Sequence, residues 1–244
     1  MTAEPTPAPP TDARIFRLLR GGVAPLGPRG VPSGIAKQPA REPVRLGPEG
    51  LEGDEVGDRR HHGGPEKALH HYAFDHYAYW RSVLDPTPTV LDAPGAFGEN
   101  LSTRGADGET AMTEETVCVG DVYRIGDALV QVSQGRQPCF KLNLRFGATD
   151  MALRVQTCGR TGWYYRVLEP GTLWEGAPIR LLERPRPTWP LARVADLLYR
   201  RPLALEELEE LASLPELALS WRRLAARRIE TRSVESWRER LGGE

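Results

Sequence analysis

Cysteine is scarce in this chain of 244 residues: the sequence holds three, Cys118, Cys139 and Cys158, and no Cys-x-x-Cys pair. An odd number of isolated cysteines argues against a disulfide framework. It also argues against an iron–sulfur cluster, which normally takes four cysteine ligands. We therefore expect a reducing, cytoplasmic location and no iron–sulfur centre within the chain.

Net charge and long apolar segments are lacking as well. The formal net charge is −1, which gives no bulk electrostatic attraction to nucleic acid or to an anionic membrane. No apolar run approaches the ~20 residues that a membrane-spanning helix requires. The sequence thus predicts neither a nucleic-acid partner nor a membrane partner.

Lysine is rare, although basic residues are not. The chain has 32 Lys plus Arg, of which three are lysines, Lys37, Lys67 and Lys141. Two of the three, Lys67 and Lys141, lie in segments that other features mark as functional.

Composition along the chain predicts a tail and two folded parts. Residues 1–11 are rich in proline and lack the apolar stretch of a signal peptide, so we expect a disordered tail. Short strand patterns separated by glycine-rich turns fill residues 12–183, which indicates a mainly β domain, a small barrel or sandwich. A run of Arg and Pro from residue 184 then leads into a helical domain at 184–244.

The periodicity of apolar residues predicts the individual elements. Strands are expected at residues 15–19, 43–46, 117–119, 121–125, 128–133, 163–168 and 178–182. Helices are expected from residue 65 to about 84, as a turn at 150–157, and at 191–199, 205–214 and 216–229. A short amphipathic end follows, with Ser233 as its expected cap.

The segment Gln131–Asn143 carries a candidate reactive thiol. Its strand pattern breaks at Gly135 and Pro138, so Cys139 should lie on a tight loop at a strand end, with Arg136 and Lys141 nearby. Neighbouring cations favour the thiolate, the form that acts as nucleophile and metal ligand. A small buried hydrophobic residue is the other common role of a free cysteine, and local sequence leaves both open.

All five histidines lie within sixteen residues: His61, His62, His70, His71 and His76. The spacing fits zinc poorly, because His71 and His76 are five apart and no His-Glu-x-x-His is present. The last three, placed on the expected helix, are interpreted as packing or surface residues. His62 differs because it precedes Gly63 and Gly64 at an expected helix N-terminus, where backbone N–H groups favour an anion. A Cys139–His62 hydrolase is chemically feasible, though no nucleophile signature accompanies it.

Three stretches together resemble one known family. They are residues 61–69 (His-His-Gly-Gly-Pro-Glu-Lys-Ala-Leu), 97–101 (Phe-Gly-Glu-Asn-Leu) and 132–142 (Val-Ser-Gln-Gly-Arg-Gln-Pro-Cys-Phe-Lys-Leu). They are similar to motifs of the MOSC family, named for the C-terminus of molybdenum-cofactor sulfurase, in its bacterial YiiM-like branch. The resemblance runs from about residue 15 to 241, and differs mildly at Glu66, where Asp is expected, and at Gly135, where Pro is expected.

The resemblance implies a MOSC-type β-barrel with a few helices, a small C-terminal three-helix domain, and a bound molybdenum–pterin (molybdenum) cofactor. By family analogy the Cys139 thiolate ligates molybdenum, a reasonable task for a soft ligand. Arg136 and Lys141 would then offset the negative charge of the cofactor. Cofactor-binding roles are also expected for Gly63, Gly64, Lys67, Asn100 and Ser133, with His62 as a donor beside the pterin.

The activity implied by the resemblance is reduction of N-hydroxylated compounds, hydroxylamino-purines among them, to amines. His62 is the candidate proton donor, since imidazole titrates near neutrality. A separate reductase would supply the electrons. Two alternatives are a non-catalytic carrier of the same cofactor and a Cys139-dependent hydrolase or thiol transferase. The sequence leaves the physiological substrate, the electron donor and the oligomeric state open.

Overall fold

The computed structural model describes residues 6–7, 13–58, 62–105 and 112–243. The tail expected at 1–11 lies outside the described residues except for Thr6 and Pro7, as does His61 of the histidine-rich motif. Within the described part of the chain, no helix combines the length and the apolar composition of a membrane span.

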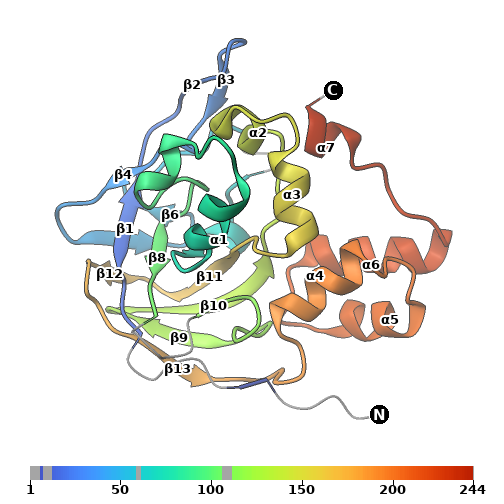
Figure 1. Ribbon diagram of the computed structural model, residues 1–244. Helices are drawn as coiled ribbons and strands as arrows, with labels where there is room; N and C mark the ends of the chain where they lie inside the picture. Colours follow the sequence, from blue (N-terminus) through green and yellow to red (C-terminus); the bar gives the residue numbers. More distant parts are fainter. Residues whose placement is uncertain (1–5, 8–12, 59–61, 106–111, 244) are drawn as a thin grey trace.

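A curled eight-stranded sheet forms the body of the protein (Figure 1), in the order β13-β9-β10-β11-β7-β8-β1-β4. Its strands pair antiparallel except β7 with β8, which are parallel. A second sheet, β12-β5-β6, and a hairpin, β2-β3, complete the β structure. The strands are β1 Arg17–Arg20, β2 Ala24–Leu26, β3 Val31–Ser33, β4 Gln38–Pro39, β5 Val44–Gly47, β6 Gly50–Leu51, β7 Leu69–Ala73, β8 Leu101–Thr103, β9 Val122–Ile125, β10 Ala128–Gly135, β11 Trp163–Glu169, β12 Gly171–Leu173 and β13 Ile179–Glu183.

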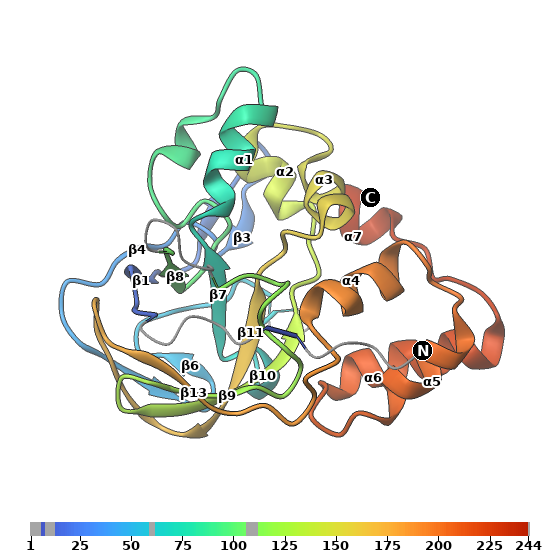
Figure 2. The ribbon, with the colours of Figure 1, turned by 60° about the horizontal axis from the view of Figure 1, so that its bottom comes forward.

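The helices form two groups, which Figures 1 and 2 show on different sides of the sheet. The first lies in the middle of the chain: η1 Pro65–Lys67, α1 His76–Val83, η2 Thr89–Asp92, α2 Lys141–Phe146 and α3 Met151–Cys158. The second comprises α4 Leu191–Tyr199, α5 Leu205–Ser213 and α6 Leu219–Thr231, and it is followed by α7 Arg238–Gly242. The predicted fold, mainly β and barrel-like with a three-helix domain after it, is confirmed.

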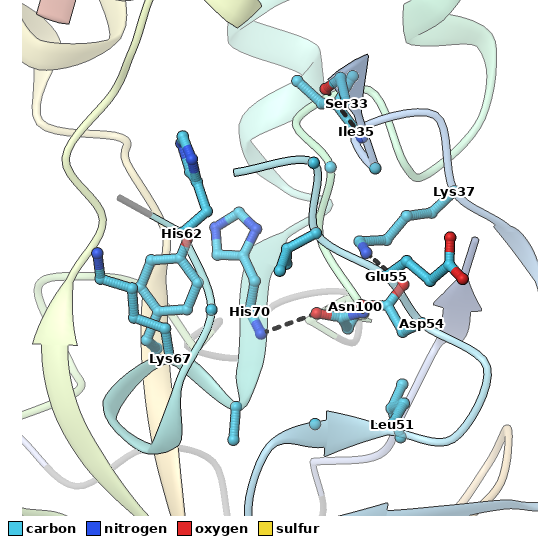
Figure 3. A pocket seen from close by; sticks show the side chains of 18 of the residues that line it. Ser33, Ile35, Lys37, Leu51, Asp54, Glu55, His62, Lys67, His70 and Asn100 are labelled. Carbon is cyan, nitrogen blue, oxygen red and sulfur yellow. Dashed lines mark hydrogen bonds and ion pairs between the residues drawn. The ribbon is translucent and has the colours of Figure 1, made fainter. Parts of the chain in front are cut away.

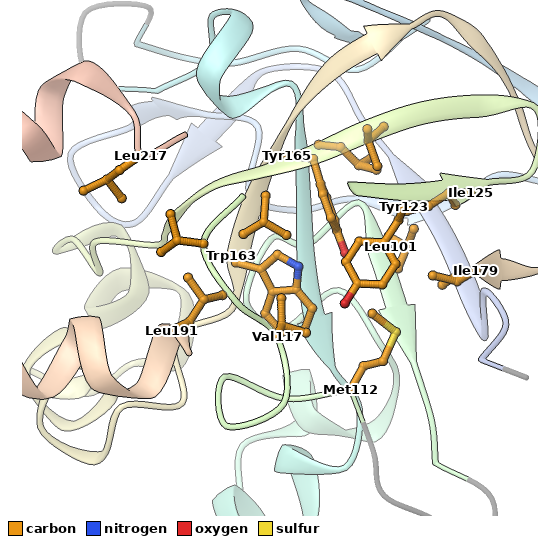
Figure 4. Close-up of a cluster of buried hydrophobic side chains, with 14 of the residues drawn as sticks. Leu101, Met112, Val117, Tyr123, Ile125, Trp163, Tyr165, Ile179, Leu191 and Leu217 are labelled. Carbon is orange, nitrogen blue, oxygen red and sulfur yellow. The ribbon is translucent and has the colours of Figure 1, made fainter. Parts of the chain in front are cut away.

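One buried cluster joins the sheet to the second helical group. Figure 4 shows Trp163 and Tyr165 of β11 beside Val117, with Leu191 of α4 and Leu217 on the helical side. All five side chains are at most 2% exposed. The helices therefore complete the hydrophobic core of the barrel. The exact boundary between residues 183 and 184 stays a prediction.

A second cluster, rich in aromatic rings, fills the space beneath α1, α2 and α3. Tyr72 stacks on Phe97 with ring centroids 4.1 Å apart, and Trp80 donates from Nε1 to the Tyr72 hydroxyl at 2.6 Å. Phe146 of α2 also packs against Phe97, with ring centroids 5.1 Å apart. This cluster fixes the segment 97–100, which enters the cavity described below.

The helix predicted from residue 65 to 84 is wrong in its first half. The structure has the single turn η1 and then the strand β7, and a helix begins only at His76. Every residue of β7 is buried, because the strand lies between β11 and β8 in the sheet. Apolar residues on a strand buried on both faces do not alternate, and their spacing here imitated that of a helix. His70 and His71, expected on that helix, are strand residues.

Two smaller expectations are also corrected. Residues 117–119 form no strand; Cys118 makes an isolated bridge to Pro190, and the segment pairs with the chain that enters α4. Ser233 caps no helix, since α7 begins after Trp237 and the Ser233 hydroxyl donates to Thr231 instead.

Candidate functional site

One cavity of about 460 Å³ collects most of the predicted site residues. Loops at the ends of strands build it, together with η1, β7 and the first turn of α2. Its volume lies in the range of small-molecule and cofactor sites. The predicted residues that line it are His62, Gly63, Gly64, Lys67, Asn100, Arg136, Cys139 and Lys141.

Cys139 lies in the loop between the end of β10 and α2, as the sequence predicts. Its side chain is 8% exposed, and its Sγ is 3.5 Å from Nε2 of His62. The backbone N–H of Arg136 donates to the Gly162 carbonyl at 2.9 Å, which ties the start of this loop to the chain before β11. The thiol is thus a fixed, nearly buried donor on the cavity wall.

Three cationic side chains surround this thiol. Arg136 donates from Nη1 to the Phe97 carbonyl at 2.7 Å, and Lys141 donates from Nζ to the Pro32 carbonyl at 2.9 Å. Burial lowers the pKa of Lys67, and the nearby Cys139 opposes that shift. Because the partners of Arg136 and Lys141 are neutral carbonyls, their charges remain available to an anionic ligand.

The surroundings of His62 favour its neutral form. Burial, and then the charges of Lys141, Lys67 and Arg136, lower its pKa to about 4. Its Nδ1 atom is buried and has no hydrogen-bond partner among the described residues. An imidazole in this environment interacts with the thiol through Nε2 and leaves Nδ1 available to a ligand.

The opposite wall is a hydrogen-bonded network around Asp54. Figure 3 shows Lys37 and Asp54 on one side of the cavity, with His62 and Lys67 on the other and His70 between them. Lys37 forms an ion pair with Asp54, and Asn100 donates from Nδ2 to the same carboxylate at 2.8 Å. The Asn100 Oδ1 atom accepts from the His70 backbone N–H at 3.1 Å. Asn100 therefore links the Asp54 carboxylate to the backbone of β7 and holds this wall of the cavity in place.

Sequence reasoning missed Lys37, Asp54 and His70. The His70 ring, expected on a helix as a packing or surface group, lines the cavity and lies 4.9 Å from the ring of Tyr164. Burial lowers its pKa well below the ordinary histidine value. For Lys37 a signal existed in the composition, because all three lysines of the chain line this cavity.

Ser133 does not line the cavity. Its hydroxyl donates to the carbonyl of Glu66 at 2.6 Å and to that of Tyr164 at 3.1 Å. This bond to Glu66 holds η1 in place and so helps to position Lys67, the next residue.

The anion site expected at a helix N-terminus takes a different form. Gly63 and Gly64 do line the cavity, with φ of +78° and +84°. The element after them is η1, a 3₁₀ turn of three residues. So short an element has almost no macrodipole, and any attraction for an anion here comes from Lys67 and nearby side chains.

The residues of the cavity fit a molybdenum–pterin cofactor. Cys139 is the one thiol among the lining residues, beside side chains of positive charge. A soft thiolate suits a metal already held by sulfur ligands, and cations suit a phosphorylated cofactor. Among the described residues, no group of three or more His, Cys, Asp or Glu side chains has a geometry to hold a metal ion by itself.

Comparison with known proteins gives concordant matches. The model of the MOSC domain matches residues 58–180, and that of the YiiM-like 3-alpha helix domain matches residues 189–232. The chain is 39% identical over 216 residues to Protein YiiM of Escherichia coli, covering 88% of this chain and 93% of that protein. The crystal structure of YiiM from Escherichia coli superposes with a TM-score of 0.74 at 35% identity, covering 90% of this chain and 98% of that one.

A fungal relative carries a functional name. The chain is 41% identical over 214 residues to a protein of Gibberella moniliformis named Reductase. The match covers 86% of this chain and 36% of the relative. The chain therefore spans about a third of that larger protein.

Proposed function

Because the chain belongs to the MOSC family, in its YiiM-like branch, we propose that it is a molybdenum-cofactor-dependent reductase of N-hydroxylated compounds. The proposed substrates are small molecules such as hydroxylamino-purines, and the products are the parent amines and water. A separate cytoplasmic reductase would supply the two electrons. The name of the fungal relative is consistent with an oxidoreductase.

The observation that carries the proposal is the position of the motif cysteine. Cys139 lies in a 460 Å³ cavity among Lys67, Arg136 and Lys141. We assign Cys139 as the protein ligand of molybdenum, and the three cations as the groups that balance the charge of the cofactor. When bound, the cofactor supplies the two-electron cleavage of the N–O bond.

His62 is the proposed proton donor to the departing oxygen. In the free protein its pKa of about 4 reflects burial and three neighbouring cations. A bound anion would offset those cations, and the imidazole would then hold a proton more readily. The Asp54–Asn100 network fixes the wall against which the substrate is held.

The test is molybdenum per chain, measured by elemental analysis. Wild type, Cys139→Ser and the control Cys158→Ser are purified from a host that makes the cofactor and from one that does not. Cys158 is a half-buried cysteine outside the cavity. We expect metal in wild type and in the control, and its loss in Cys139→Ser. Metal retained in Cys139→Ser would refute the ligand assignment.

Turnover separates the proposal from a carrier role. Metal-loaded wild type is given an artificial electron donor and a hydroxylamino-purine. Reduction to the amine is expected. A protein that binds the metal but reduces no N-hydroxylated compound with any donor is a carrier.

A thiol-dependent hydrolase or transferase is the second candidate, favoured by the 3.5 Å between Cys139 Sγ and His62 Nε2. Activated cysteines usually have a base that a third group orients. The Nδ1 atom of His62 has no such partner among the residues that the structure describes, which weighs against this candidate. Cys139-dependent activity in protein from the cofactor-deficient host would establish it.

A further inference from the structure

The last helix of the described chain leaves the three-helix group and contacts the loop that carries Cys139. Figure 1 shows α7 beside α2 and α3, joined to α6 by a long connection. The segment 233–243 comprises that connection and α7, and lies beyond the residues matched by either family model. We call it the C-terminal strap.

The strap makes backbone contacts on both sides of Cys139. The Phe140 N–H donates to the Arg240 carbonyl at 2.8 Å, and the Arg240 guanidinium donates from Nη1 to the Pro138 carbonyl at 2.5 Å. The same guanidinium donates from Nη2 to Oε1 of Gln156 on α3. One residue thus holds both neighbours of Cys139 and ties them to α3.

Two further contacts fix the strap on α2. Asn143 donates from Nδ2 to the Leu241 carbonyl at 2.8 Å, and its Oδ1 accepts from the Ala152 N–H. Gly243 packs on the Phe140 ring so closely that an added Cβ would lie 2.7 Å from it, and its φ is +78°. The contact requires glycine at this position.

The other end of the strap is anchored in the helical group. Arg228 of α6, with no exposed side-chain surface, pairs with Glu235 at 2.6 Å and donates to the Leu198 carbonyl of α4 at 2.8 Å. Glu235 also accepts from Nε1 of Trp237. The strap therefore connects Arg228, which is buried in the helical domain, to the Cys139 loop.

We propose that the C-terminal strap holds the Cys139 loop in the geometry that presents the thiol to the cavity, with Arg240 as the positioning residue. Pro138 and Phe140 are held from outside the barrel, so the conformation of Cys139 between them depends on the strap. The importance of this conformation for metal ligation rests on the proposed function. The contact between the strap and the Cys139 loop is independent of that function.

The test uses the rate at which iodoacetamide alkylates Cys139 in the full-length protein purified without cofactor. Site-resolved mass spectrometry follows each cysteine, and Cys118 and Cys158 are internal references. The variants are Arg240→Ala, Arg240→Lys and Arg238→Ala. Arg238 is an exposed residue of the same helix whose side chain forms no hydrogen bond or ion pair with the described residues, so its replacement removes the same charge without touching the loop.

Arg240→Ala should raise the alkylation rate of Cys139 about tenfold, because the loop would open locally without global unfolding. Cys158 should change by less than about twofold, since α3 remains packed. Arg238→Ala should match wild type. Arg240→Lys should restore part of the protection, because an ammonium group can reach one of the two acceptors.

An unchanged Cys139 rate in Arg240→Ala would overturn the proposal. So would a parallel rise at all three cysteines with a lower Tm, which indicates general loosening. If Arg240→Ala does not fold, Gly243→Val displaces the strap from Phe140 without a change of charge, and the same criteria apply. If Arg240→Ala selectively raises the alkylation rate of Cys139 while wild type never binds molybdenum, the proposal for the strap stands and the proposed function is refuted.

Discussion

The ion pair between Lys37 and Asp54 gives a sharp test of the cavity wall. The side chains are 6% and 11% exposed, so both charges lie almost entirely out of water. The Asp54 carboxylate also accepts from the Gly21 N–H at 2.9 Å and from Asn100 at 2.8 Å. Replacing Lys37 by Met removes the ammonium group and keeps an apolar side chain of similar length.

The expected loss of stability follows from the charge that remains. Removing one partner of a buried pair costs about 3–5 kcal/mol, because the other charge stays buried without compensation. Two N–H donors still solvate Asp54, so we expect Lys37→Met to cost near the lower limit, about 3 kcal/mol. For a chain of this length that corresponds to a Tm about 6–12 °C lower. The double variant Lys37→Met, Asp54→Asn leaves no unpaired charge and should lose less than the single variant.

Urea unfolding followed by tryptophan fluorescence measures these differences. The matched control is Arg124→Met, which breaks an ion pair with Glu169 whose side chains are 37% and 58% exposed. It should cost less than about 1 kcal/mol. The argument is refuted if Lys37→Met costs no more than Arg124→Met, or if the double variant is as unstable as the single one.

Two further predictions concern residues around β7. Burial holds the pKa of His71 well below its ordinary value of 6.5, so below that pH the unfolded chain binds a proton that the folded chain does not. The free energy of unfolding should therefore decrease as the pH is lowered below about 6.5, by up to about 1.4 kcal/mol per pH unit for this residue. Urea titrations at pH 7 and pH 5 measure this dependence, and His71→Gln should reduce it. Gly162 has φ of +72°, and an added Cβ would lie 2.4 Å from the His71 carbonyl oxygen. Gly162→Ala should cost at least about 2 kcal/mol by thermal unfolding, and an unchanged Tm would contradict the strain inferred here.

Local sequence predicted the elements whose stabilising contacts are themselves local. The Gly126-Asp127 turn places Ile125 opposite Ala128 in the β9–β10 hairpin, as expected. The helices at 191–199 and 205–214 occur almost at the predicted bounds, because one face of each is apolar and Pro202 interrupts the chain between them. In these cases pattern and packing favour the same structure.

β7 shows where local sequence is insufficient. Its neighbours in the sheet are β11, about ninety residues later, and β8, thirty residues later. Those pairings bury both faces and turn a segment with helical spacing into a strand. His71 illustrates the consequence: its two ring nitrogens meet Tyr165 and Thr103, partners that no local pattern indicates.

The cavity was predictable at its motif residues, which include Asn100 on the opposite wall, and was not predictable at Lys37 and Asp54. In the motif segments 62–67 and 136–141, the sequence itself places a thiol and cationic residues in short loops. Lys37 and Asp54 have no motif, and their pairing depends on two loops that meet only in the folded chain. Ser133 shows the reverse case: it lies within a motif, yet its hydroxyl donates to the backbone carbonyls of Glu66 and Tyr164 and not into the cavity.

The distribution of charge decides how an anionic ligand can be oriented in the cavity. Lys37 is neutralised by Asp54, so among the described residues that wall offers no unpaired positive charge, and the acidic Glu55 lies beside Asp54 (Figure 3). On the other wall Arg136 and Lys141 donate to neutral carbonyls and keep their charge. Electrostatic attraction for an anion therefore increases toward Cys139. If the proposed function holds, the phosphorylated cofactor would be drawn to the wall that carries the thiol, and a substrate with N–H donors would face the carboxylate of Asp54.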